Sequence, residues 1–494
     1  MVGTTKLAPL GKREVLIRFA APEFDQLLAH VFARYPHREW ATFARFGWRE
    51  TSEALVLTLA QLVLPEANDL DVSVPNVAFQ EQYTLRMALE SENGPLAVGV
   101  VHSHPSDCAP MPSPTDDDMD AYFAEYFGGF GPGRPYISLI ISRLSQDLVV
   151  SGRVYWRDQW HIASRLVAIG SSAQLWVRTG KSAFAKTPRR RTERLSAALG
   201  EESAELLRES SVAVVGVGGT GSVAAEVLAR AGVGELILID PDSVEESNLE
   251  RVHGSVPEDA LRNRAKVEVA KRHVLSIDSS CRVRAIRGAI PQPETIDAIV
   301  RADVVLCCTD SQVSRLVVSD LAVRYLVPAM DCGVTMEGNN RRVTGEVMQF
   351  VRFLPYDACA LCRDMIAPTR IAQELMSDEE KAQRQRAAEV AALSETANPD
   401  AYWRDMPQLN TVGFLTTAAG SIAAGFAIGW VSKRFNPPFS RLQLNLVAPL
   451  FEVVDSPVEA RPSCTCRRVR GFADQALGDA YVTPPTHWPP SATL

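Results

Sequence analysis

The chain has 494 residues, which is too long for one ordinary hydrophobic core and suits two domains of roughly 150 to 280 residues. Its 46% apolar and 22% charged residues are ordinary for a soluble globular protein and argue against long disordered tracts. The formal net charge of −8 argues against a general nucleic-acid binder, because neutralising phosphates requires a surplus of Lys and Arg.

The N-terminal segment MVGTTKLAPLGKREV lacks the long apolar stretch of a signal peptide, so we expect a cytoplasmic protein. In a reducing compartment the nine cysteines favour metal or catalytic roles over disulfides. One membrane-like segment, residues 412–431, is diluted by Thr416, Thr417 and Ser421. We interpret it as a buried helix that packs closely on a neighbour, with no membrane association.

Residues 1–169 have the pattern of an α+β domain. Apolar residues at helical spacing follow Pro22, and Pro36 ends the predicted helix. Strand-like runs follow, namely EWATFARFGW (39–48), ALVLTLAQLVL (54–64), PLAVGVVHSHP (95–105), YISLIIS (136–142) and LVVSGRVYW (148–156). Residues 170–191 are rich in Ser, Lys and Arg without a clear period, which indicates a linker.

Residues 192–470 have a different, alternating pattern. From Ser211 the run SVAVVGVGGTGS predicts a buried strand and a glycine turn, followed by a helix in VAAEVLARAGVG and a second buried strand in ELILID. DVVLCCTD from Asp303 and LVPAMDCG from Leu326 predict further parallel strands of a doubly wound sheet, and residues 377–396 predict an exposed helix. Residues 471–494, Pro-rich near the end, are expected to form a loose tail.

A zinc-binding pattern lies at the end of one predicted strand. Strand alternation puts the imidazoles of His102 and His104 in HSHP on one side, and Asp116 follows in PSPTD. Two His and one carboxylate leave a fourth zinc position open for water. Alternatively, the His pair satisfies a strand edge and Asp116 only caps the following helix.

These residues resemble the motif of the JAB/MPN (JAMM) zinc metallopeptidases: an upstream Glu, then HSHP, then Ser and Asp three apart. The resemblance implies a deubiquitinase-like zinc isopeptidase domain in which His102, His104 and Asp116 hold zinc, Glu39 acts as the base and Ser113 stabilises the oxyanion. Glu50 or Glu53 could replace Glu39, which is assigned by position alone. An inactive relative with the same fold is the alternative.

A nucleotide-binding pattern opens the second domain. GVGGTG places Gly216, Gly218, Gly219 and Gly221 at a strand-to-helix turn, where backbone amides and the helix N-terminus can cradle phosphate. Asp240 ends the second strand and could bind a ribose, so these residues alone fit NAD and ATP equally well.

The residues that follow discriminate between the two nucleotides. Asn248 and Arg251 in ESNLER, Lys266 in RNRAK and Asp310 in CCTDS supply two cations for phosphates and an acid for magnesium, which hydride transfer does not need. In adenylation, cations and magnesium offset the repulsion between an attacking carboxylate and a triphosphate.

This half resembles the ThiF/MoeB and ubiquitin-activating superfamily across nearly all of residues 190–470, which implies a Rossmann-like doubly wound adenylyltransferase domain. The resemblance implies that Asp240 binds ribose, that Asn248, Arg251 and Lys266 hold the triphosphate of ATP, and that Asp310 coordinates magnesium. RTER resembles the family's RxxR, in which the second Arg, here Arg194, reaches the partner subunit's nucleotide; the implied assembly is a homodimer. The alternative for Arg194 is a plain basic helix face.

Four cysteines form two pairs about a hundred residues apart. Cys359 and Cys362 in CALC, with Cys464 and Cys466 in SCTC, predict a structural four-thiolate zinc site, and the family often carries one. Otherwise they are buried free thiols. Residues 363–463 contain no Cys, so the thioester-forming cysteine of many ubiquitin-activating enzymes is missing there.

The combination predicts a bifunctional enzyme that processes a ubiquitin-like protein and adenylates its C-terminus in a bacterial ubiquitin-like conjugation system. Such systems commonly use a separate conjugating enzyme. One alternative is activation and processing of a sulfur-carrier protein for thiocarboxylate formation, which the missing crossover cysteine favours. A second is a non-catalytic adaptor that binds ubiquitin-like tails.

Overall fold

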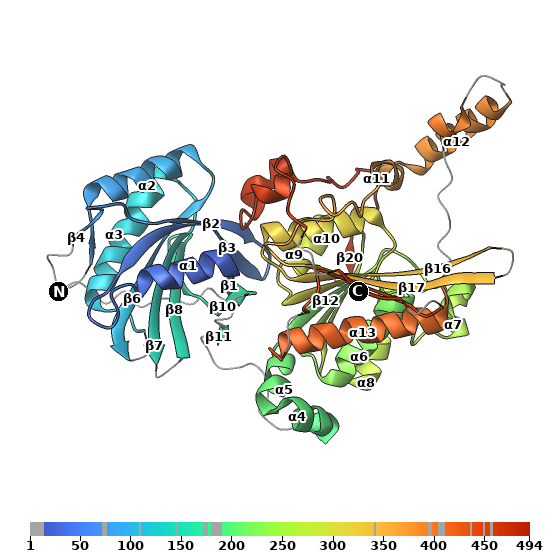
Figure 1. Cartoon of the computed structure of the whole chain (residues 1–494), viewed down its shortest axis with the longest axis horizontal. Helices are drawn as coiled ribbons and strands as arrows, with labels where there is room; N and C mark the ends of the chain where they lie inside the picture. Colours follow the sequence, from blue (N-terminus) through green and yellow to red (C-terminus); the bar gives the residue numbers. More distant parts are fainter. Residues whose placement is uncertain are drawn as a thin grey trace.

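A computed structural model describes residues 14–71, 77–107, 110–144, 147–170, 176–178, 190–339, 342–393, 398–403, 411–434, 437–447, 450–454 and 458–494. The described chain contains two nine-stranded sheets, one from each half of the sequence, which lie next to each other (Figure 1). Most of the predicted linker lies outside the described residues, but residues 176–178 form a strand that belongs to the first sheet.

The first sheet has the order β11-β10-β1-β3-β2-β6-β7-β8-β9. In chain order its strands are β1 (Glu14–Ala20), β2 (Ala41–Glu50), β3 (Ala54–Val63), β6 (Ala97–Asp107), β7 (Tyr136–Leu144), β8 (Asp147–Trp156), β9 (Gln159–Ile162), β10 (Arg165–Ile169) and β11 (Trp176–Arg178). A separate two-stranded ribbon joins β4 (Leu70–Asp71) to β5 (Ala78–Phe79). Each of the five predicted strand-like runs overlaps a strand. β1, which the sequence reading missed, lies inside the sheet between β10 and β3.

Helices cover both faces of this sheet. α1 (Ala21–Val31) packs Phe24 and Leu27 on one face, while α2 (Glu81–Asn93) and α3 (Pro114–Phe130) pack on the other. Alternation along β2 divides the two cores, because Phe43 joins the α2 and α3 side and Ala44 joins the α1 side. The first half is therefore an α+β layered unit, as its pattern predicts.

The second sheet has the order β19-β18-β17-β16-β15-β12-β13-β14-β20. Its strands are β12 (Ser211–Val215), β13 (Glu235–Ile239), β14 (Arg282–Arg287), β15 (Val304–Cys307), β16 (Ala329–Asn339), β17 (Arg342–Phe353), β18 (Arg441–Asn445), β19 (Leu450–Val454) and β20 (Ala492–Thr493). The five central strands, β16 to β14, are parallel, which confirms the predicted doubly wound sheet.

Helices lie on both faces of the second sheet (Figure 1). One face is covered by α6 (Gly219–Ala231), α8 (Lys266–Ile277) and α13 (Gly413–Val431), and the other by α9 (Pro293–Ile299) and α10 (Gln312–Arg324). The remaining helices are α4 (Glu193–Leu199), α5 (Glu201–Arg208), α7 (Pro257–Leu261), α11 (Pro368–Leu375) and α12 (Asp378–Ala392). α12 confirms the helix predicted within residues 377–396, and Ser377 caps its N-terminus.

Among the described helices, α13 alone has the length and hydropathy of a membrane span. It packs along α6, and its Leu415, Ala419 and Ala423 belong to the core of the second sheet. A side chain at Gly420 would overlap the backbone carbonyl of Thr220 on α6. The small residues thus permit close helix packing within this unit, as the sequence predicts.

The expectation of a loose C-terminal tail is wrong. β20 pairs antiparallel with β14 and so forms the edge of the second sheet, and the backbone N–H of Leu494 donates to Ala285 at 2.8 Å. Composition misled this prediction, because a two-residue edge strand supplied by distant pairing leaves no local periodicity.

The segment 470–475 joins the two halves instead of belonging to a tail. The hydroxyl of Thr58 donates to the carbonyl of Gly471 at 2.7 Å, and Arg49 pairs with Asp474 at 2.9 Å. Buried Arg18 of β1 donates to the carbonyls of Val300 at 2.6 Å and Ala302 at 2.8 Å. Leu16, Ala54 and Val56 of the first sheet share one apolar cluster with β12, β13 and α10 of the second.

We predict that Gly471→Ala weakens this joint. Gly471 has φ +70, and a Cβ there would overlap the carbonyl of Leu59. Backbone strain alone costs about 1–3 kcal/mol, so the unfolding midpoint should fall. Gly478→Ala, where a Cβ meets nothing, is the matched control for denaturant unfolding. Equal stability of the two variants would contradict the prediction.

Candidate functional site

A tight glycine turn begins the nucleotide-type pocket of the second sheet. Gly216 follows β12 with φ +84, a conformation that glycine adopts without strain. A Cβ at Gly221 would overlap the carbonyl of Gly216, so only glycine lets α6 start this close to the strand. The N-terminus of α6 consequently faces the pocket, where its free N–H groups favour an anion.

Asp240, at the end of β13, lies beside this turn. Its carboxylate accepts hydrogen bonds from the backbone N–H of Val217 at 2.8 Å and of Asp242 at 2.9 Å. Burial raises the pKa of Asp240 to about 6, although nearby Lys266 acts in the opposite direction. Burial of Lys266 disfavours its charge, but Asp240 and Asp242 outweigh it and raise the pKa of that ammonium.

The pocket has a volume of about 740 Å³ and gathers most of the predicted nucleotide residues. Those that line it are Gly216, Gly218, Gly219, Asp240, Asn248, Arg251, Lys266 and Asp310. Within the described chain, Gly221 lies beneath the turn without lining the pocket, and Arg194 is exposed on α4 away from its own chain's pocket. The spacing of the motifs therefore identified one real cavity.

The sequence reading missed several pocket residues. Arg315, Arg370, Lys381, Trp403 and Trp488 also line the cavity. Arg315 lies on α10 and the others lie on segments that return to the pocket from far along the chain. Of these five residues, only Arg315 lies close to a recognised motif, five residues after Asp310. That proximity was the one signal in the sequence that could have identified a further pocket residue.

The crossover helix α11 is tied to the loop that carries Asp310. Glu374 accepts hydrogen bonds from the Ser311 hydroxyl at 2.7 Å and from the backbone N–H groups of Gln312 and Val313, both at 2.9 Å. It therefore satisfies the N-terminus of α10. Asp310 itself is exposed to the pocket, so its carboxylate is accessible to a bound cation.

Two histidines and an aspartate converge at the carboxyl end of β6 in the first sheet. Nε2 of His102 lies 3.2 Å from Oδ1 of Asp116, and Nε2 of His104 lies 3.5 Å from Oδ2. Ser103 faces the opposite side, where its hydroxyl donates to the carbonyl of Val31 at 2.5 Å. One ligand atom from each of the three residues lies within 4.8 Å of the other two.

Asp116 serves both as a helix cap and as a member of this cluster. Its carboxylate accepts from the backbone N–H of Ser113 at 2.6 Å, and its own N–H donates to the Ser113 hydroxyl at 3.2 Å. Burial opposes ionisation of Asp116, but hydrogen bonds with His102 and His104 outweigh it and hold its pKa well below the ordinary range. The hydrogen bond with Asp116 raises the pKa of His104.

The structure distinguishes the three candidate glutamates. Oε1 of Glu39 lies 3.9 Å from Nε2 of His104, next to the cluster. Glu50 instead pairs with Arg157 at 2.6 Å, and Glu53 pairs with Arg284 at 3.1 Å across the joint between the sheets. Only Glu39 of these three is placed to act at the cluster.

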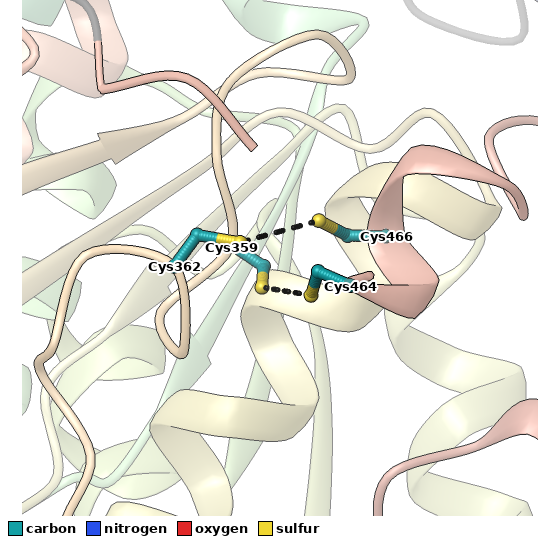
Figure 2. Close-up of side chains that lie close together, drawn as sticks. All are labelled: Cys359, Cys362, Cys464 and Cys466. Carbon is teal, nitrogen blue, oxygen red and sulfur yellow. Dashed lines mark hydrogen bonds between the residues drawn. The ribbon is translucent and has the colours of Figure 1, made fainter. Parts of the chain in front are cut away.

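The four paired cysteines meet in one cluster (Figure 2). Sγ of Cys359 lies 3.7 Å from that of Cys464, and Sγ of Cys362 lies 3.8 Å from that of Cys466. The first pair lies in the loop after β17, and the second lies at the short 3₁₀ turn η4 (Thr465–Arg467). The hydroxyl of Tyr481 approaches Sγ of Cys464 at 3.0 Å.

Cys332 is buried in β16, as its sequence context predicts, and it borders the nucleotide pocket. Cys307 is buried in β15, whereas Cys308, the next residue, is half-buried and lines the pocket.

Comparison with known proteins agrees with the second half of this architecture. The sequence profile of the ThiF family matches residues 190–467, more than half of the chain. This chain belongs to the ThiF family. The matched residues contain the whole glycine turn, all the predicted nucleotide residues and the four cysteines, whereas the first sheet and its His102 cluster precede them.

Curated relatives match parts of this ThiF region. The sulfur carrier protein ThiS adenylyltransferase of Bacillus subtilis is 31% identical over 142 residues, which covers 29% of this chain and 42% of that protein. Ubiquitin-like modifier-activating enzyme 5 of Aedes aegypti is 33% identical over 171 residues, which covers 32% and 41%. The chain thus spans less than half the length of each of these two relatives.

Among solved structures, E. coli MccB in complex with MccA-N7isoASN overlaps 56% of this chain and 75% of its own, with 20% identity and a TM-score of 0.42. A structure of PaaA overlaps 57% and 77%, with 17% identity and a TM-score of 0.39.

We predict that Asp240 makes stability depend on pH in a defined direction. Its pKa of about 6 in the folded ThiF region exceeds its usual value of 3.8, so the folded chain holds the proton more tightly. Without nucleotide, the free energy of unfolding should therefore fall as pH rises from about 4 to about 6. Asp240→Asn should flatten this slope in urea unfolding.

Asp378→Asn is the control, because the side chain of Asp378 is fully exposed on α12, does not line the pocket of Asp240, and should leave the slope unchanged. Identical slopes in wild type and Asp240→Asn would contradict the assignment.

Proposed function

We propose that the ThiF region adenylates the C-terminal carboxylate of a small protein with a ubiquitin-like fold. The observation that carries the proposal is the single pocket in which the glycine turn, Asp240, the cations and exposed Asp310 meet. The names of the B. subtilis and A. aegypti relatives describe such activation and support the same chemistry.

The predicted nucleotide residues that line the pocket have distinct roles in this reaction. The N-terminus of α6 binds phosphate, Asp240 holds a ribose hydroxyl, and Arg251 and Lys266 offset triphosphate charge. Asp310 would hold magnesium, which supplies charge neutralisation at the reacting phosphate. The carboxylate oxygen of the carrier attacks the α-phosphorus of ATP, the bond to the β-phosphate bridging oxygen breaks, and pyrophosphate leaves with that electron pair.

We also propose that the first sheet is a JAB/MPN-type zinc isopeptidase. His102 is buried, its Nε2 lies 3.2 Å from Oδ1 of Asp116, and its Nδ1 lacks a hydrogen-bond partner among the described residues, so the ring offers a nitrogen to a metal ion at this cluster. With His104 and Asp116 this set suits zinc, which lowers the pKa of bound water to about 7. In this proposal Glu39, which lies 3.9 Å from Nε2 of His104, takes the proton of that water, and the Ser113 hydroxyl, which accepts from the N–H of Asp116, keeps its own proton to donate.

The four cysteines suit a second, structural zinc ion. All eight described cysteines lack disulfides, and four of them direct sulfur atoms into one small space. Free thiols agree with the cytoplasmic location that we propose.

The carrier is a ubiquitin-like protein whose extended tail the first site trims before the second activates it. A sulfur-carrier protein is the alternative, and the burial of Cys332 together with the absence of Cys from residues 363–463 favours it, because no exposed thiol crosses the pocket there.

Exposed Arg194 on α4 supports a homodimer in which each copy completes the other's nucleotide site.

We predict that the two activities separate by mutation. Asp310→Ala should reduce ATP–pyrophosphate exchange by about 100-fold or more, because it removes the magnesium carboxylate, and should leave tail cleavage intact. His104→Ala should abolish cleavage of an extended carrier and leave exchange on the mature carrier intact. Loss of both activities in either variant would argue against two independent sites.

We predict that Cys466→Ser removes one zinc ion per chain and lowers the unfolding midpoint, because three thiolates hold structural zinc poorly. Inductively coupled plasma mass spectrometry measures the zinc content. Cys281→Ser, at a buried cysteine outside the cluster, should keep it. Unchanged zinc in Cys466→Ser would refute the four-thiolate site.

A further inference from the structure

The carboxyl ends of three neighbouring parallel strands lie in a row along the nucleotide pocket. The glycine turn follows β12, Asp240 follows β13, and residues 288–290 follow β14, the next strand in the sheet. Phosphates belong at the N-terminus of α6 and the ribose at Asp240. If a bound nucleotide extends from phosphate to ribose in the direction from β12 to β13, its base lies at the end of β14.

An aromatic side chain borders the pocket at that end. Gly288, Ala289 and Ile290 line this part of the cavity together with Trp488. The indole of Trp488 is half-buried and packs against the apolar cluster that contains Ile239 and Ile290. Trp488 thus reaches the base end of the pocket although it lies 198 positions after Ile290 in the sequence.

The chain around Trp488 is held by several independent contacts. The side-chain amide of Gln292 donates to the carbonyl of Pro489 at 2.5 Å, and the backbone N–H of Trp488 donates to Pro485 at 3.2 Å. β20 then pairs with β14, and Lys271 donates to the carbonyl of Leu494 at 2.6 Å. The indole is therefore presented by a fixed segment, at no large ordering cost when a nucleotide binds.

We propose that Trp488 forms one wall of the adenine site and contacts the face of the base. The inference rests on the proposed function only in that the pocket takes a nucleotide. Aromatic side chains favour bases because each base presents a flat π-face, and the contact contributes without hydrogen bonds. The C-terminal segment 484–494 is accordingly part of the nucleotide site.

The test is equilibrium binding of Mg-ATP by calorimetry to the wild-type full chain and to its single variants. Trp488→Ala should weaken binding by about 5-fold to 150-fold, the usual effect of removing a base-stacking ring. Trp488→Leu keeps apolar volume but loses the aromatic face, so its ATP binding should also be weaker than that of the wild type. Trp488→Phe should bind close to wild type.

His487→Ala is the matched control, because His487 is the exposed neighbour on the same segment and should leave ATP binding unchanged. Unfolding midpoints of the unliganded variants separate loss of contact from loss of fold. ATP affinity equal to wild type in Trp488→Leu overturns the stacking contact, and equal affinity in Trp488→Ala overturns any role for the side chain. If Trp403→Ala alone weakens binding, the base lies on that other pocket tryptophan and the proposal fails.

The experiment also separates this inference from the function on which it rests. Absence of ATP binding by the wild-type chain would refute the nucleotide pocket itself. ATP binding that survives replacement of Trp488 would refute only the inference.

Discussion

The close approach of Gly221 to the carbonyl of Gly216 determines the nucleotide pocket. Because no side chain intervenes, α6 starts directly at the end of β12, and its N–H groups face the same space as Asp240 on the neighbouring strand. Parallel pairing then brings the loops after β13, β14 and β15 to the same edge of the sheet. The phosphate, ribose, base and metal positions that we propose all follow from this one arrangement.

A second glycine contact joins the two halves of the chain. Side chains at Gly47 of β2 or Gly471 would overlap backbone on the opposite side of the joint, so the strand and the segment 470–475 approach at backbone distance. The ion pairs of Arg49 and the buried Arg18 surround this contact. Residues 470–475 follow the cysteine cluster directly in sequence. The folding of the C-terminal region around the cysteines and the attachment of the first sheet therefore depend on neighbouring parts of one loop.

The two candidate chemistries have different support. The ThiF region is established by the family match and by its pocket. The His102, His104 and Asp116 cluster rests on geometry: side chains from a strand and a helix converge, and Nδ1 of His102 has no hydrogen-bond partner in the described structure. Their combination in one chain is the basis of our proposal that one site cuts the tail of a substrate and the other activates it.

Local patterns by themselves determined five strands of the first sheet, the central strands β12, β13, β15 and β16 of the second, the glycine turn, the paired histidines and the cysteine pairs, because each depends on side-chain period or spacing within about twenty residues. Tertiary structure alone decided which of the candidate glutamates lies at the histidine cluster: Glu39 lies beside His104, whereas Glu53 pairs with Arg284 of β14. It also turned the expected loose tail into β20 and carried Trp488 into the pocket. Such contacts join residues that are distant in sequence, and their pairing is set by sheet order and packing, which leave no periodic signal in the segments they connect.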